Sequence, residues 1–155
     1  MQKFFGFFAR VCFSAIFIVA GINKILNWDA SEQYLVNQLL DVLSKSYHQD
    51  FVKPLFDHIL PMAPTLLVLA TIAELGGGLL VLLGIQVRLG ATILCLFLIP
   101  TTLLFHNFWD LEGAAQQLQM IMFLKNLSIF GGALAFVAYG KGRRFKNEHA
   151  HSHHD

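Results

Sequence analysis

The sequence predicts an all-α integral membrane protein: a four-helix transmembrane bundle with short amphipathic helices in the first extracytoplasmic loop. Composition is the first reason, because 55% of the 155 residues are hydrophobic and only 14% are charged, whereas soluble domains average about 25% charged residues. The second reason is that four separate apolar runs approach the roughly 20 residues that a helix needs to cross a bilayer. The formal charge of +1 gives no reason to expect a nucleic-acid partner. The expected surroundings are the lipid bilayer.

The four apolar runs cover residues 4–26, 65–83, 89–105 and 118–139, within one transmembrane domain at residues 1–140. No small-residue cleavage site follows the first run, so it is interpreted as a retained helix and not as a signal peptide. The outer loop, residues 27–64, carries Leu35, Leu39 and Val42 at helical spacing, and a second apolar set that ends at Pro61 and Pro64. These sets predict two short helices that lie on the membrane surface or cap the bundle.

Basic residues are unevenly distributed between the two sides of the predicted bundle. Those on the side of the termini are Lys3, Arg88, Lys141, Arg143, Arg144 and Lys146. The loops on the other side contain only Lys45 and Lys53. The positive-inside rule therefore predicts that both termini are cytoplasmic, in a multi-pass protein of a bacterial inner membrane.

The segment at residues 141–155 is predicted to be a basic, His-rich cytoplasmic tail. Its clustered histidines are His149, His151, His153 and His154. Imidazoles at this density can chelate Zn, Ni or Cu, although the spacing is not that of a structural zinc site. The alternatives are weak metal sequestration and a flexible, solvated tail without a ligand.

Glu74 is the one acidic residue inside the predicted spans. A charge at bilayer depth costs roughly 2.5–3.5 kcal/mol on insertion scales, so we expect a partner for it. Arg10, Lys24 and Lys125 are the cations within the spans, and Arg88 lies at the inner rim. Helical spacing places each of them on a polar or small-residue face, and in a bundle such faces turn inward.

Three cations against one acid favour an acceptor ligand between the helices. We expect an apolar-walled cavity that holds a quinone or a small sulfur oxyanion, with Glu74 and His106 as the catalytic, proton-transferring residues. The predicted ligand-binding residues are Arg10, Asn23, Lys24, Arg88, Lys125 and Asn126.

The alternative is that these charges are structural. A buried ion pair of Glu74 with Arg10 or Lys125 would fix helix register while adding little net stability. Lys24 could extend to the headgroups, and His106 could be an interfacial loop residue. The adjacent glycines at 76–78 and 131–132 are interpreted as sites of close helix packing.

Several short motifs occur together along the chain: Ala20-Gly21-Ile22-Asn23-Lys24-Ile25, Glu74-Leu75-Gly76-Gly77-Gly78 with Leu83-Gly84 and Arg88, Phe105-His106-Asn107-Phe108-Trp109, and Leu124-Lys125-Asn126-Leu127 with Gly131-Gly132. In this combination, over about residues 4–139, the chain resembles the DoxX family. The resemblance implies a small four-helix protein of the bacterial inner membrane. The wider group includes a membrane subunit of thiosulfate:quinone oxidoreductase and members linked to detoxification enzymes in oxidative-stress complexes.

The leading hypothesis is a membrane subunit of a quinone-linked redox system, in sulfur-compound oxidation or oxidative-stress defence. Quinone is the expected cofactor, and a partner subunit or homo-oligomer is the expected assembly. The chain has neither a redox-active cysteine pair nor a haem-ligand pattern, so electron transfer would need a bound quinone or a partner. The alternative is a non-enzymatic membrane scaffold or assembly factor for a partner complex. A third hypothesis is a permeation path for a small anion or metal.

Overall fold

The computed structural model describes residues 1–45 and 52–140, and all regular elements in those residues are helical. The helices are α1 (Gln2–Leu26), α2 (Trp28–Lys45), α3 (Val52–Ile59), α4 (Ala63–Leu83), α5 (Val87–Phe105) and α6 (Gly113–Tyr139), with 3-10 turns η1 (Leu60–Met62) and η2 (Phe108–Asp110). Four of them, α1, α4, α5 and α6, are long and apolar enough to cross a membrane. The predicted all-α membrane bundle is therefore confirmed.

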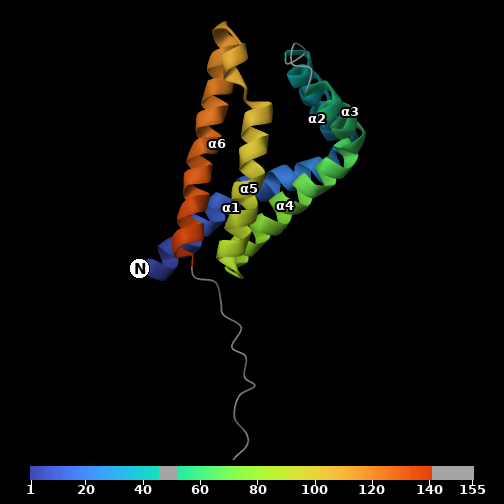
Figure 1. Cartoon of the computed structure of the whole chain (residues 1–155). Helices are drawn as coiled ribbons and strands as arrows, with labels where there is room; N and C mark the ends of the chain where they lie inside the picture. The colour runs from blue at the N-terminus through green and yellow to red at the C-terminus, as the bar shows by residue number, and fades with distance from the viewer. Residues whose placement is uncertain (46–51, 141–155) are drawn as a thin grey trace, which may run out of the picture.

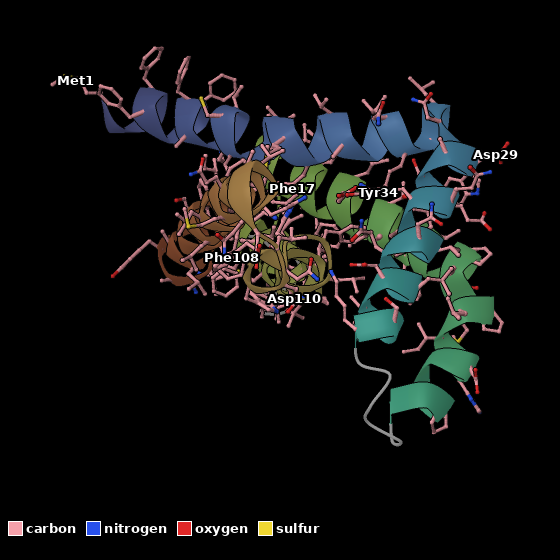
Figure 2. The ribbon with its side chains drawn as sticks, turned by 90° about the horizontal axis from the view of Figure 1, so that it is seen from above. Met1, Phe17, Asp29, Tyr34, Phe108 and Asp110 are labelled. Carbon is pink, nitrogen blue, oxygen red and sulfur yellow. The ribbon has the colours of Figure 1, made fainter. Side chains whose placement is uncertain are left out.

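The four long helices pack in chain order, with α1 against α4, α4 against α5, and α5 against α6. Figure 1 shows α5 and α6 side by side, while α1 runs obliquely across the bundle. In the perpendicular view of Figure 2, α1 is seen lengthwise, and its Met1 end extends beyond the other helices. The phenylalanines of this end, Phe4, Phe5, Phe7 and Phe8, are accordingly exposed.

Two adjacent glycines of α4 let two different helices approach. An added Cβ at Gly77 would lie 2.8 Å from Leu94 Cγ and 3.0 Å from the carbonyl oxygen of Gly90, both on α5. An added Cβ at Gly78 would lie 3.1 Å from Ile18 Cγ1 on α1. Small residues permit this close backbone approach in membranes. The packing interpretation therefore fits Gly77 and Gly78, whereas an added Cβ at Gly76 would meet no atom within 4 Å.

The tight turn between α4 and α5 forms because Gly84 adopts a left-handed conformation with φ 73°. Its amide donates to the carbonyl of Val81, and the amide of Ile85 donates to the carbonyl of Leu80. This is the bonding pattern of a glycine-terminated helix. The turn lies at the same end of the bundle as Met1 and the C-terminal end of α6 (Figure 1).

Helix α2 packs against the opposite end of the bundle. Leu35 and Leu39 of α2 are buried in a cluster with Ala63 and Leu67 at the start of α4. Tyr34 stacks on Phe105 at the end of α5, with ring centroids 5.4 Å apart. These contacts attach α2 to the bundle, and the two predicted positions for these helices, on the membrane surface or capping the bundle, stay predictions. The main core is a separate cluster around Phe17, Val81, Leu94 and neighbouring residues.

Candidate functional site

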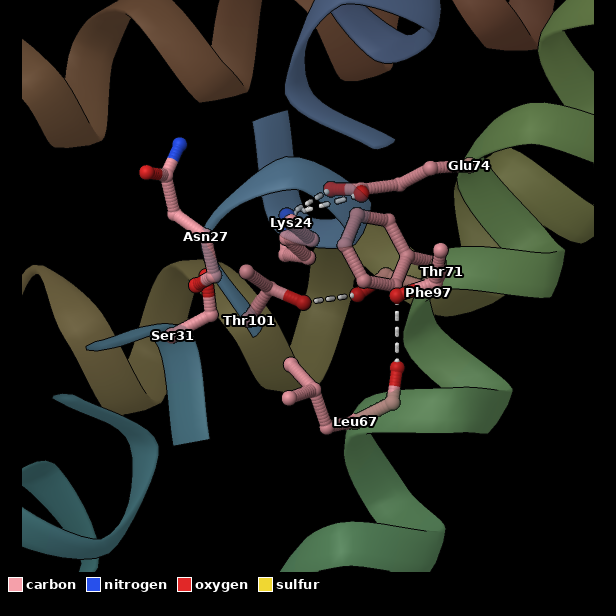
Figure 3. A network of polar contacts seen from close by, with 8 residues as sticks. All are labelled: Lys24, Asn27, Ser31, Leu67, Thr71, Glu74, Phe97 and Thr101. Atoms are coloured by element: carbon pink, nitrogen blue, oxygen red, sulfur yellow. Dashed lines mark hydrogen bonds and ion pairs between the residues drawn. The ribbon is translucent and has the colours of Figure 1, made fainter. Parts of the chain in front are cut away.

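The buried carboxylate of Glu74 is held by Lys24. Lys24 Nζ donates to Glu74 Oε1 at 2.9 Å and to Oε2 at 2.7 Å, which joins the last turns of α1 to the middle of α4 (Figure 3). The Glu74 side chain is 5% exposed and that of Lys24 is 25% exposed. The partner of the intramembrane acid is therefore Lys24, and not Arg10 or Lys125 as the structural alternative expected, and each carboxylate oxygen accepts one bond from it.

The hydroxyl groups near this pair bond to their own helices. Thr71 Oγ1 donates to the carbonyl of Leu67 at 2.8 Å, and Thr101 Oγ1 donates to the carbonyl of Phe97 at 2.6 Å (Figure 3). Such bonds to the preceding turn satisfy a hydroxyl inside a membrane helix. These hydroxyl protons consequently point into backbone carbonyls and not toward a ligand beside Glu74.

A second polar pair joins α5 to α6. Asn126 Nδ2 donates to Thr102 Oγ1 at 3.2 Å, and both residues are buried. At the C-terminal end of α5, His106 Nδ1 lies 2.8 Å from Gln119 Oε1 on α6. Together these contacts form a polar seam between α5 and α6. It shares no residue with the Lys24–Glu74 pair, which joins α1 to α4.

The two arginines of the predicted site lie at the end of the bundle that carries the Gly84 turn and the C-terminal end of α6. Arg10 packs its guanidinium on the Gly84 turn, where its Cζ would lie 3.1 Å from an added Cβ. Gly84 follows Glu74 by ten residues, or about 15 Å of helix. Arg88 donates through Nε and Nη2 to the carbonyls of Gly140 and Ala138, at 3.0 and 3.3 Å. Neither arginine reaches the carboxylate of Glu74.

Lys125 and Asn23 are exposed on the outside of the bundle. The nearest polar contact of Lys125 Nζ is Met122 Sδ on the same helix, at 3.3 Å. Asn23 accepts from Asn27 Nδ2, through its backbone carbonyl at 3.2 Å and its side-chain oxygen at 3.0 Å. Lys125, next to the buried Asn126, therefore points away from the interior of the bundle.

The structure corrects the expectation of one cluster around Glu74. Of the expected cavity residues, only Lys24 bonds to Glu74 in the described part of the chain. Arg10 lies at the Gly84 turn, His106 at the α5–α6 seam and Lys125 on the lipid-facing surface. The catalytic and ligand-binding roles assigned to these residues stay predictions. The tail histidines His149, His151, His153 and His154 lie outside the described residues. Within residues 1–45 and 52–140, no group of three or more potential ligands is placed to hold a metal.

Sequence reasoning missed three contributors to these contacts: Thr101, Gln119 and Gly90. Gln119 had a usable signal, because it precedes Asn126 by seven residues and so shares its helical face. The sequence also contains a signal for Gly90, since a small residue directly after a tight turn favours close packing of the two helices.

An apolar groove lies along α4 and α5. It measures about 530 Å³ and is lined by Leu69, Ile72, Ala73, Gly76, Gly77, Leu79, Leu80, Leu83 and Ile93. None of the predicted site residues lines it. The groove suits an apolar chain, because it offers no side-chain donor to a carbonyl or an anion.

Comparison with known proteins agrees with the helical membrane architecture. The profile of the DoxX family matches residues 5–107. The inner membrane protein YphA of Escherichia coli (strain K12) is 27% identical over 134 residues, which cover 86% of this chain and 81% of that protein. The inner membrane protein YqjF of the same organism is 28% identical over 134 residues, covering 86% of this chain and 82% of that protein. No solved structure matches significantly.

Proposed function

The chain belongs to the DoxX family, and we propose that it serves as a non-enzymatic membrane scaffold or assembly factor for a partner complex. Its relatives are named as inner membrane proteins, and together with four apolar helices this supports a multi-pass inner-membrane location. The basic residues around the termini support the orientation with both ends in the cytoplasm. Family membership itself assigns no chemistry, because activity depends on the site and not on the fold.

The observation that carries the proposal is the closed contact between Lys24 and Glu74. A proton-transferring or ligand-binding carboxylate needs an oxygen that faces its substrate. Both oxygens of Glu74 instead accept from one lysine, at 2.9 and 2.7 Å. A pair of this kind fixes how two helices meet, since separating the charges in an apolar interior is costly.

The remaining polar groups of the bundle support the same proposal. Asn126 is bonded to Thr102, and His106 contacts Gln119. Each contact links α5 to α6, so these polar groups hold the bundle together. The lipid-facing surfaces of the helices, that of α1 included, stay available to other molecules.

A second candidate is the membrane subunit of a quinone-linked redox system, in sulfur-compound oxidation or oxidative-stress defence. The groove of about 530 Å³ along α4 and α5 favours it, because an isoprenoid tail needs an apolar channel of this kind. The quinone ring would need donors for its carbonyl oxygens, and those would have to come from a partner subunit.

The two candidates separate in one experiment on the purified full-length protein. The protein is isolated in mild detergent, extracted for quinones, and assayed for quinone reduction by thiosulfate. Scaffold function predicts no stoichiometric quinone and no turnover, and predicts that Glu74→Gln lowers the amount of folded protein recovered. The matched control is Glu112→Gln, an exposed glutamate before α6, which should leave recovery unchanged. Bound quinone with turnover that depends on Glu74 would overturn the proposal.

A further inference from the structure

Lys125 places a cation on the lipid-facing surface of α6, inside a membrane span. The apolar run of this span begins at Leu118, seven residues before Lys125, and ends at Tyr139, 14 residues after it. At 1.5 Å per residue, the two ends of the run are about 10 and 21 Å away. Its Nζ contacts Met122 Sδ, and no carboxylate in the described residues pairs with it.

Facing lipid alone is an unfavourable state for this side chain. Lysines near the ends of membrane helices extend to the headgroups, but charged residues at mid-span pair with a partner or line a polar cavity. Inside this bundle, Lys24 and Glu74 form such a pair. Lys125 has the same need and meets no counter-charge among the described residues of its own chain.

The surface around Lys125 is shaped for a neighbouring helix. Ser128, Gly132 and Ala135 follow it at steps of three and four residues, which places all four on one stripe of α6. Lys125, Ser128 and Ala135 are exposed, and Gly132 is half-buried beside Phe13. Ser128 and Ala135 are small and exposed, and small residues let two membrane helices approach closely, whereas an added Cβ at Gly132 would lie 3.6 Å from Phe13 of α1. We call these four residues the Lys125 stripe.

Charge decides which helix fits this stripe. A second copy of the chain would bring another Lys125, and its only acid within the spans, Glu74, has both oxygens bound to Lys24. We propose that the Lys125 stripe docks a transmembrane helix of a different protein, one that carries an aspartate or glutamate near its middle. This assignment rests on the proposed scaffold function and names the face and the chemistry of its partner.

The test uses the full-length chain in vesicles of phosphatidylethanolamine and phosphatidylglycerol. The probes are two synthetic leucine-alanine peptides of about 20 residues, identical except for aspartate or leucine at the centre. Energy transfer between labelled chain and labelled peptide measures association. The aspartate peptide should associate about tenfold more tightly than the leucine peptide, the size expected of one polar contact between membrane helices.

Variants of exposed residues keep the test independent of folding. Lys125→Met should remove the preference for aspartate, and Lys125→Arg should retain it. Ser128→Leu should weaken binding of the aspartate peptide by blocking close approach. Its matched control is Gly76→Leu on the α4 groove, where an added Cβ meets no atom within 4 Å, and this variant should bind as the wild type does.

The assignment would be overturned by equal binding of the two peptides, by a preference that survives Lys125→Met, or by self-association of the chain that depends on Lys125. Loss of binding in Gly76→Leu with no change in Ser128→Leu would also overturn it and move docking to the α4–α5 groove, leaving the scaffold function intact. Quinone turnover by the purified protein would instead overturn the scaffold function, whatever the peptides show.

Discussion

Lys24 and Glu74 are 50 residues apart in the sequence, yet one amine bonds both oxygens of the carboxylate, at 2.9 and 2.7 Å. The contact ties the last turns of α1 to the middle of α4, where the Glu74 side chain is only 5% exposed. Because removing one partner leaves the other charge unpaired in an apolar interior, the pair makes the position of α1 depend on α4.

Lys24→Met and Glu74→Met are each expected to destabilise the bundle by about 1–3 kcal/mol, since each leaves a polar group without its partner. The double variant Lys24→Met/Glu74→Met should recover most of this loss, because no charge remains unpaired. Thermal unfolding in detergent measures all three. Additive losses in the double variant would contradict a direct coupling between the two side chains.

Gly77→Ala is expected to destabilise the protein by about 1–3 kcal/mol, because the new methyl group would meet Leu94 and the backbone of α5. Gly76→Ala is the matched control on the neighbouring residue, where an added Cβ meets nothing within 4 Å. The control should unfold at or slightly above the wild-type temperature, since alanine is the better helix former. Equal effects at the two positions would refute close packing at Gly77.

Thr102→Val and Asn126→Leu should each weaken the α5–α6 contact by about 1 kcal/mol, because they remove the buried bond at 3.2 Å. Ser128→Ala serves as the control, since its hydroxyl donates only to Leu124 of its own helix. A double-mutant cycle in detergent measures the coupling between Thr102 and Asn126. A coupling near zero would mean that the two groups do not depend on each other.

Arg88→Met should loosen the C-terminal turn of α6, because two donors to the carbonyls of Gly140 and Ala138 are lost. The expected cost is about 1 kcal/mol, as for ordinary hydrogen bonds near a surface. Hydrogen exchange of the last α6 amides should rise while exchange in the middle of α6 stays unchanged. Arg88→Lys should show most of the same effect, because lysine cannot donate through a planar fork. Full protection in Arg88→Met would rule out this role.

The predicted orientation is tested with Asp110→Cys and Tyr139→Cys, two exposed positions at opposite ends of the bundle. A membrane-impermeant thiol reagent should label Asp110→Cys in spheroplasts, and should label Tyr139→Cys only after the membrane is opened. The native Cys12 and Cys95 lie inside spans, so little background is expected. The reverse labelling pattern would place both termini outside.

Much of the fold was predictable from the sequence because a bilayer limits the choices. A segment that crosses lipid must satisfy its backbone internally, so each apolar run of sufficient length is a helix. The ends of the runs at Leu26, Leu83, Phe105 and Tyr139 coincide with the ends of the helices. The starts of the helices agree less well with the starts of the runs. Helix α6 begins at Gly113 and not at residue 118, because its helical geometry continues through polar residues such as Gln116 and Gln117.

The sequence alone determined that Glu74 needs a cation and that Lys24, Arg10 and Lys125 were available. Only the tertiary structure decided among them, because the choice depends on how each helix is rotated and inclined against its neighbours. The oblique crossing of α1 brings Lys24 to Glu74 and leaves Arg10 at the Gly84 turn. The buried Asn126 turns one face of α6 inward and thereby turns its neighbour Lys125 outward. Rotation is set by many small packing contacts between distant residues, and no local pattern encodes their sum.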